Sequence, residues 1–183
     1  LVKVCAVSVN RTLDLDLRAG LGNYGTTLPH ILGVDPSGEV IEVGSGVAQL
    51  KVGQRVVAYG GVRCGGCEQC LRHNYLQCVQ PRMLGVQSWG GYAEYLCLPD
   101  HNWVSIPDAL LFPEATLVAR HFPLAFGEVH LADVKEGEWA LVMGAAGGLG
   151  SCIVQILKTM QVQVIAAAGS DDRVETALSL GAD

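Results

Sequence analysis

The chain has 183 residues, 50% of them hydrophobic, and a formal net charge of −6. This length can hold one large domain or two small ones with a buried core. The acidic balance argues against nucleic acid or an anionic membrane surface as a partner, and no apolar run approaches the roughly 20 residues of a membrane span.

Residues 1 to about 110 are rich in Gly and β-branched residues, with turn signals at short intervals, which predicts a mainly β region. Strands are expected at residues 2–9, 38–44, 54–59 and 92–98. We expect these strands to form a small barrel or sandwich. The pattern changes at Pro113, where a helix is expected over residues 113–134.

Four of the 7 cysteines are closely spaced, at Cys64, Cys67, Cys70 and Cys78. Four thiolates on a Gly-rich loop can form a tetrahedron around one Zn²⁺. This pattern suits a metal site in a reducing compartment better than a disulfide framework. Because protein ligands would fill all four positions, the spacing predicts one structural zinc, with a 4Fe–4S cluster as the alternative. The remaining cysteines are expected to be buried small apolar residues: Cys5, Cys97 and Cys152.

Residues 139–160 combine an apolar run, a Gly-rich turn and a helical period. The run 139–143 is typical of a strand that is buried on both faces. The N–H groups of the turn and the positive end of the helix face one point, where a pyrophosphate can bind without a basic side chain. An ordinary tight turn is the alternative. The predicted cofactor contacts in the turn are Gly144, Ala145, Ala146, Gly147, Gly148, Leu149 and Gly150.

A second strand is expected at residues 162–168, ending at Ala168. An NAD-specific site usually has Asp or Glu at this point, where the carboxylate binds the ribose 2′-hydroxyl. Ser170 and Arg173 follow instead and would accept a 2′-phosphate, which favours NADPH over NADH. The alternative is that Ser170 only caps the next helix and that Arg173 is solvated.

Several motifs, taken in chain order, resemble the medium-chain dehydrogenase/reductase superfamily, which includes zinc alcohol dehydrogenases and quinone or enoyl reductases. These motifs are residues 32–44 and 52–57, the four-cysteine lobe, residues 90–95, the Gly-rich turn and residues 180–182.

The resemblance implies an α/β fold with a mainly β domain. Residues 1–115 would form a partial GroES-like β-barrel, the catalytic domain, with a zinc lobe at about 62–82. Residues 116–183 would form the N-terminal half of a Rossmann domain, a doubly wound parallel sheet. The resemblance also implies a chain that is truncated at both ends.

The resemblance further implies where a catalytic zinc would be bound. The position of its His ligand is Val34, and its two Cys positions fall at Asn10 or Arg11 and near Arg120. Valine has no ligand atom, and an always-protonated arginine has no lone pair to offer. We therefore expect a structural zinc and no catalytic zinc.

This departure favours the quinone oxidoreductase and enoyl reductase branch, in which NADPH delivers hydride to a quinone or an α,β-unsaturated carbonyl. There Asn10 would hydrogen-bond the substrate carbonyl or the nicotinamide, and Arg120 would stabilise an enolate. A surface or ion-paired Arg120 is the alternative. A packed or exposed helix histidine is the favoured interpretation of His121, and a proton donor is the alternative.

Three other functions stay open at this point. The first is a dehydrogenase that acts on alcohols by other means, the second a non-catalytic NADPH-binding protein. The third is a zinc-ribbon nucleic-acid module, which the acidic balance disfavours. We expect a small-molecule substrate (a quinone, enone or related carbonyl), no nucleic acid and no membrane partner. We also expect a homodimer or homotetramer when full length, located in the cytoplasm.

Overall fold

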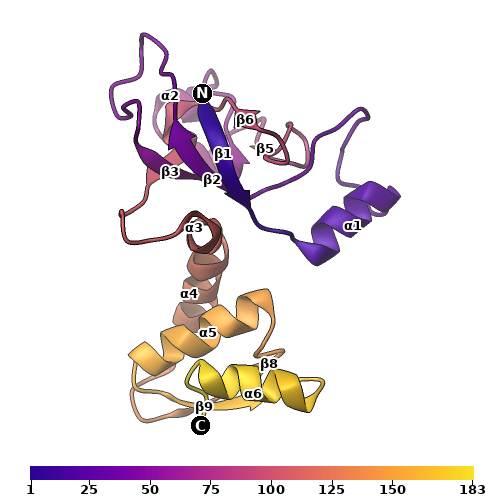
Figure 1. Ribbon diagram of the computed structural model, residues 1–183, viewed down its shortest axis with the longest axis vertical. Coiled ribbons are helices and arrows are strands. Elements are labelled where there is room, and N and C mark those ends of the chain that lie inside the picture. Colours follow the sequence, from indigo (N-terminus) through magenta and orange to yellow (C-terminus); the bar gives the residue numbers. More distant parts are fainter. The chain divides into compact units, whose positions relative to one another are not determined.

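The computed structural model describes residues 1–183 and divides into two compact units, Leu1–Ala119 and Arg120–Asp183. The first unit is mainly β and the second is α/β (Figure 1). The expected assignment of residues 1–115 and 116–183 to two named domains stays a prediction. No helix is long and apolar enough to cross a membrane.

A five-stranded sheet organises the first unit. Its strands are β1 (Val2–Val7), β2 (Pro36–Val40), β3 (Arg55–Ala58), β6 (Tyr95–Leu96) and β7 (Trp103–Ser105). Antiparallel ladders join them in the order β6-β1-β2-β3-β7. One face buries a core that includes Val2, Val40, Val56 and Trp103. Alternate strand residues point to the same face, which is why this core draws on every second position.

Short elements surround this sheet. They are α1 (Arg11–Ala19), β4 (Gly61–Val62), α2 (Glu68–Leu71), η1 (Tyr75–Gln77), β5 (Arg82–Met83), η2 (Asp100–Asn102) and α3 (Phe112–Val118). Strands β4 and β5 pair with each other at the base of the four-cysteine lobe. Helix α3 packs on the sheet through Ala115, which lies in a small buried cluster with Val57 and Ile106.

The second unit is built on two parallel strands. Its elements are α4 (His121–Ala132), β8 (Trp139–Met143), α5 (Gly148–Thr159), β9 (Gln163–Ala167) and α6 (Asp171–Ser179). The strands pair in register from Trp139↔Gln163 to Met143↔Ala167. Val142, Val154, Ile156 and Val164 are buried between the sheet and its helices.

The helix predicted over residues 113–134 is two helices, α3 and α4, separated at Arg120 (φ −135°, ψ −59°). Pro123 does not break α4, because it lies in the first turn, where the missing N–H has no intrahelical partner. The strand predicted at 38–44 is shifted to Pro36–Val40, and the one predicted at 92–98 shortens to Tyr95–Leu96. Helix α1 was not predicted.

The prediction that residues 139–143 are buried on both faces is wrong. Trp139, Leu141 and Met143 are 61%, 63% and 73% exposed. The reason is that helices cover one face of the two-stranded sheet and leave the other open, and that β8 has β9 as its sole strand partner. The burial predicted for Cys5 and Cys97 is also wrong, since both are exposed, whereas Cys152 is buried.

Candidate functional site

The structure brings the four predicted metal ligands together in one lobe. Cys67 is the N-cap of α2, Cys70 lies within that helix, and Cys78 follows η1. The sulfur atoms of these three residues and of Cys64 all lie within 4.8 Å of one another. The Cys64 and Cys70 sulfurs are 3.9 Å apart. A tetrahedral Zn²⁺ with bonds of about 2.3 Å needs sulfurs about 3.8 Å apart, so the lobe fits a structural zinc.

Backbone N–H groups support thiolates in this lobe. Cys64 N–H points at the Cys78 sulfur, and Cys70 N–H points at the Cys67 sulfur, each at 3.5 Å. Backbone hydrogen bonds from Val79 and Cys70 lower the pKa of the Cys67 thiol to about 6. Desolvation raises the pKa of the buried Cys70 thiol to about 12, so this ligand needs the positive charge of a metal to ionise.

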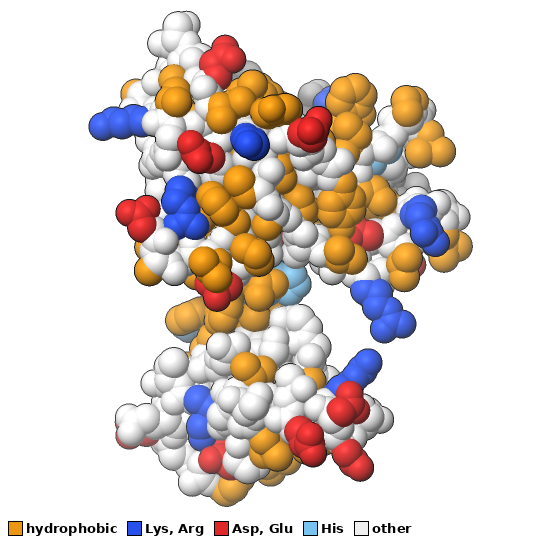
Figure 2. Space-filling model, viewed as in Figure 1, with side chains coloured by type: hydrophobic (Ala, Val, Ile, Leu, Met, Phe, Trp, Pro, Cys, Tyr) orange, Lys and Arg blue, Asp and Glu red, His pale blue; other side chains and the backbone are white.

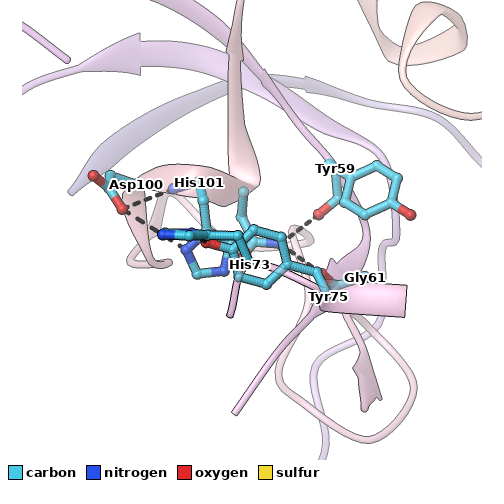
Figure 3. A network of polar contacts seen from close by, with 7 residues as sticks. Tyr59, Gly61, His73, Tyr75, Asp100 and His101 are labelled. Carbon is cyan, nitrogen blue, oxygen red and sulfur yellow. Dashed lines mark hydrogen bonds and ion pairs between the residues drawn. The ribbon is translucent and has the colours of Figure 1, made fainter. Parts of the chain in front are cut away.

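Aromatic packing attaches the lobe to η2 (Figure 3). The ring of Tyr75, inside the lobe, stacks on that of His101 in η2, with centroids 5.4 Å apart and planes 6° from parallel. The Tyr75 hydroxyl also hydrogen-bonds His73 Nδ1 at 2.8 Å. The stacking of Tyr75 on His101 gave no signal in the sequence, because it joins segments that are distant in the chain.

Asn102 completes this attachment. Its side chain is fully buried, and its amide donates to the carbonyl oxygens of Tyr59 (2.8 Å) and Gly61 (2.9 Å) (Figure 3). Both acceptors lie where the chain leaves β3 for the lobe. The buried amide therefore fixes the entrance of the lobe against η2. The two bonds satisfy its NH₂ group, whereas its Oδ1 is buried without a partner.

In the second unit the Gly-rich turn has the geometry that the sequence predicts for it. Gly144 has φ +65°, and a Cβ at Gly150 would lie 2.3 Å from the Gly144 carbonyl oxygen. Gly147 is the N-cap of α5 and has an extended backbone. The first N–H groups of α5 have no partner within the helix and carry its positive end. The binding of a pyrophosphate at this turn stays a prediction.

Ala168, Ser170 and Arg173 lie at the same edge of the β8–β9 sheet as this turn. Parallel register pairs Met143 with Ala167, so both strands end together and the N-termini of α5 and α6 follow from one edge. Ser170 is the N-cap of α6 and makes no side-chain bond to that helix's capping positions.

Arg173 has acidic neighbours on α6. A hydrogen bond from Ser170 lowers the pKa of the Asp172 carboxyl, and the Arg173 charge contributes to the same shift. Acidic and basic side chains gather over α6 on the face shown in Figure 2. Arg173 is therefore solvated and near carboxylates, which limits how strongly it would hold a phosphate.

In the first unit Asn10 is the N-cap of α1, and its backbone N–H donates to Asp14 Oδ2 at 2.9 Å. The same oxygen accepts the Tyr92 hydroxyl at 2.5 Å, a contact across 78 residues. Asp14 is 8% exposed, and its other oxygen is buried without a partner. The start of α1 is thus held by a buried carboxylate that sequence reasoning missed.

The positions expected for a catalytic zinc do not fit a metal. Val34 is 1% exposed and apolar, and Asn10, Arg11 and Arg120 offer no thiolate or imidazole. Asn10 belongs to the first unit and Arg120 to the second, where it is the N-cap of α4. The assignment of both to one catalytic site stays a prediction.

Comparison with known proteins identifies the family. The model of the alcohol dehydrogenase GroES-like domain matches residues 1–108. An alcohol dehydrogenase of Geobacillus stearothermophilus is 37% identical over 100% of this chain and 54% of its own length. An NAD-dependent alcohol dehydrogenase of Sulfolobus acidocaldarius is 32% identical over 100% of this chain and 55% of its own length. The chain spans about half the length of the curated relatives it matches.

Solved structures agree with this result. The crystal structure of an NAD-dependent alcohol dehydrogenase aligns with a TM-score of 0.88 and 39% identity, over 100% of this chain and 53% of that one. A zinc-binding dehydrogenase of Sinorhizobium meliloti bound to NADP aligns with a TM-score of 0.85 and 28% identity, over 99% of this chain and 52% of that one.

A mainly β GroES-like unit with an α/β unit after it defines the class of the zinc-binding dehydrogenases. The chain belongs to the alcohol dehydrogenase GroES-like family, within the medium-chain dehydrogenase/reductase superfamily. This confirms the predicted superfamily and fold class.

We predict one zinc per chain, held by the four-cysteine lobe. Elemental analysis of purified protein should find one zinc and no iron. Cys67→Ser should lower the zinc content severalfold and loosen the lobe, because metal binding and folding of such sites are coupled. Cys97→Ser, at an exposed cysteine outside the lobe, is the control and should keep one zinc. Two zincs per chain, or iron, would contradict the assignment.

We predict that Tyr92→Phe destabilises the first unit by about 1–2 kcal/mol, the value of a partly exposed hydrogen bond to a carboxylate. Burial, followed by the bond to Asp14, raises the pKa of Tyr92 above its ordinary value of 10.0. The contribution of the Tyr92 hydroxyl to the free energy of unfolding is therefore complete below about pH 10, and it is lost as the pH rises toward the folded-state pKa.

Urea unfolding at pH 7 and above pH 10 checks this prediction. The difference in the free energy of unfolding between the wild type and Tyr92→Phe should be smaller at the higher pH. Tyr95→Phe, at a half-exposed tyrosine on β6, is the matched control and should change little. Equal stabilities of the wild type and Tyr92→Phe at pH 7 would show that the contact with Asp14 adds nothing.

Proposed function

We propose that the whole protein is an NADPH-dependent oxidoreductase that transfers hydride to a quinone or an α,β-unsaturated carbonyl without a catalytic zinc. The observation that carries this proposal is the burial of an apolar side chain, Val34, where the family resemblance places a zinc-binding histidine. The expected small-molecule substrate, the homodimer or homotetramer and the cytoplasmic location belong to the same proposal.

Cofactor binding would rest on two groups of residues. The turn Gly144–Gly150 would take the pyrophosphate on the N-terminal N–H groups of α5. Ser170 and Arg173 would take the 2′-phosphate, a role that the absence of a carboxylate at Ala168 supports. The NADP bound by the Sinorhizobium meliloti relative is consistent with this preference.

When bound, NADPH supplies the hydride, and the protein supplies position and electrostatics. Asn10 would donate its side-chain amide to the substrate carbonyl, and the Asp14–Tyr92 pair would keep the backbone of Asn10 in place. Arg120 would stabilise the negative charge that develops on the carbonyl oxygen. A conjugated carbonyl spreads that charge, so hydrogen-bond donors can replace a metal there.

An alcohol dehydrogenase of the same superfamily is the second candidate. Its support is that the relatives reported above are named alcohol dehydrogenases, one of them NAD-dependent. The residues at the catalytic-zinc positions count against it, because alcohol oxidation in that class uses a metal to stabilise the alkoxide. A non-catalytic NADPH-binding protein is the third candidate.

Steady-state assays of the whole protein separate these candidates. We expect NADPH oxidation with members of a quinone and enone panel, unchanged after treatment with a chelator that leaves the structural zinc in place. Reduction of NAD⁺ or NADP⁺ by alcohols, without quinone or enone reduction, would favour the second candidate. NADPH binding without any turnover would favour the third.

We predict that the whole protein prefers NADPH to NADH and that Arg173→Ala removes this preference. The variant should bind NADPH about tenfold more weakly and NADH nearly unchanged. A charge-assisted hydrogen bond contributes roughly 1.5 kcal/mol, and about 1.4 kcal/mol is a factor of ten in Kd.

Ala168→Asp extends this test. It places a carboxylate against the 2′-phosphate and offers the NADH ribose an acceptor, so NADPH should lose affinity and NADH should gain it. Titration of both cofactors against the three proteins decides the assignment. Equal losses of affinity for NADPH and NADH in Arg173→Ala would mean that Arg173 stabilises the fold and does not contact the 2′-phosphate.

A further inference from the structure

His121 is the first residue of α4, and its ring lies against the start of α5. A methyl group added at Gly148, the first residue of α5, would come within 3.3 Å of both Cδ2 and Nε2 of His121. Both residues belong to the second unit, in which α4 and α5 pack along each other. The glycine thus leaves room for an imidazole edge beside the Gly-rich turn.

The hydrogen-bonding state of the ring follows from its surroundings. His121 Nδ1 is buried and has no hydrogen-bond partner. A buried N–H without an acceptor is rarer and costlier than an unused lone pair, so the neutral ring keeps its proton on the other nitrogen. The Nε2–H therefore faces the turn as a donor.

We propose that His121 is a cofactor-binding residue that donates its Nε2–H to the pyrophosphate of the dinucleotide. The inference rests on the proposed function and adds a side-chain donor to the backbone N–H groups of a twelve-residue helix, α5. NADPH and NADH carry the same pyrophosphate. His121 therefore acts on both cofactors alike, unlike Arg173, which would meet only the 2′-phosphate.

The test measures dissociation constants of NADPH, NADH and ADP for the whole protein and its variants. His121→Phe keeps an aromatic ring and removes the donor, and it should weaken the binding of all three ligands by about tenfold, as expected for one hydrogen bond to a charged acceptor. His121→Gln places an amide N–H near the position of Nε2 and should recover most of the affinity. His130→Phe, at an exposed histidine in the last turn of α4, should leave all three constants unchanged.

Each outcome assigns a role. Unchanged binding in His121→Phe, while Arg173→Ala loses NADPH, overturns the His121 inference and leaves the proposed function standing. A loss that Gln does not recover, accompanied by a lower melting temperature in both variants, also overturns it and makes His121 a packing residue. Absence of NADPH, NADH and ADP binding in the wild type overturns the proposed function itself.

Discussion

The absence of a side chain at Gly150 is the constraint on which the second unit depends. A Cβ there would lie 2.3 Å from the Gly144 oxygen and 3.0 Å from the Cα of Ala145, well inside van der Waals contact. Because Gly150 allows this approach, α5 begins directly at the end of β8. Its positive end therefore lies at the strand edge from which α6 also starts. The course of the turn and the start of α5 therefore depend on the close contact between Gly150 and residues 144–145.

Features that depend on neighbouring residues could be predicted from the sequence. The spacing of Cys64, Cys67, Cys70 and Cys78 predicts a cluster because four thiolates on one Gly-rich loop can surround a single zinc ion. The strand–turn–helix pattern likewise predicts a Gly-rich turn, since glycine is needed where φ is positive, as at Gly144. The burial of β8 could not be predicted in this way. Its apolar residues are typical of a strand buried on both faces, but one face is exposed. Burial depends on which elements cover the sheet, and composition does not predict that.

Contacts between distant segments could not be predicted. Residues 12–17 alternate polar and apolar side chains, a period that favours a strand, but they belong to helix α1. The helix is favoured by a tertiary contact: Tyr92, distant in the chain, donates to Asp14, which also holds the N–H of Asn10. The stacking of Tyr75 on His101 is of the same kind. Such pairs leave no periodic trace, because each partner alone looks like an ordinary surface residue.

The four-cysteine lobe is independent of the positions expected for a catalytic zinc, so a structural zinc does not require them. The four-cysteine lobe draws all its ligands from residues 64–78 and has its own attachment to η2. The catalytic position draws on separate segments, and at Val34 the space is fully used. A Cβ at Gly85 would lie 3.0 Å from Val34 Cγ1 and 2.8 Å from the Gly33 oxygen.

A larger, polar imidazole at position 34 would need these backbones to move, and the other positions expected for a catalytic zinc offer no thiolate or imidazole. Histidine at this single position therefore cannot restore a metal site. The surrounding packing is adapted to the apolar side chain. Under the proposed function, hydrogen-bond donors would therefore polarise the substrate carbonyl, and substrates whose conjugation spreads the developing charge would suit this arrangement.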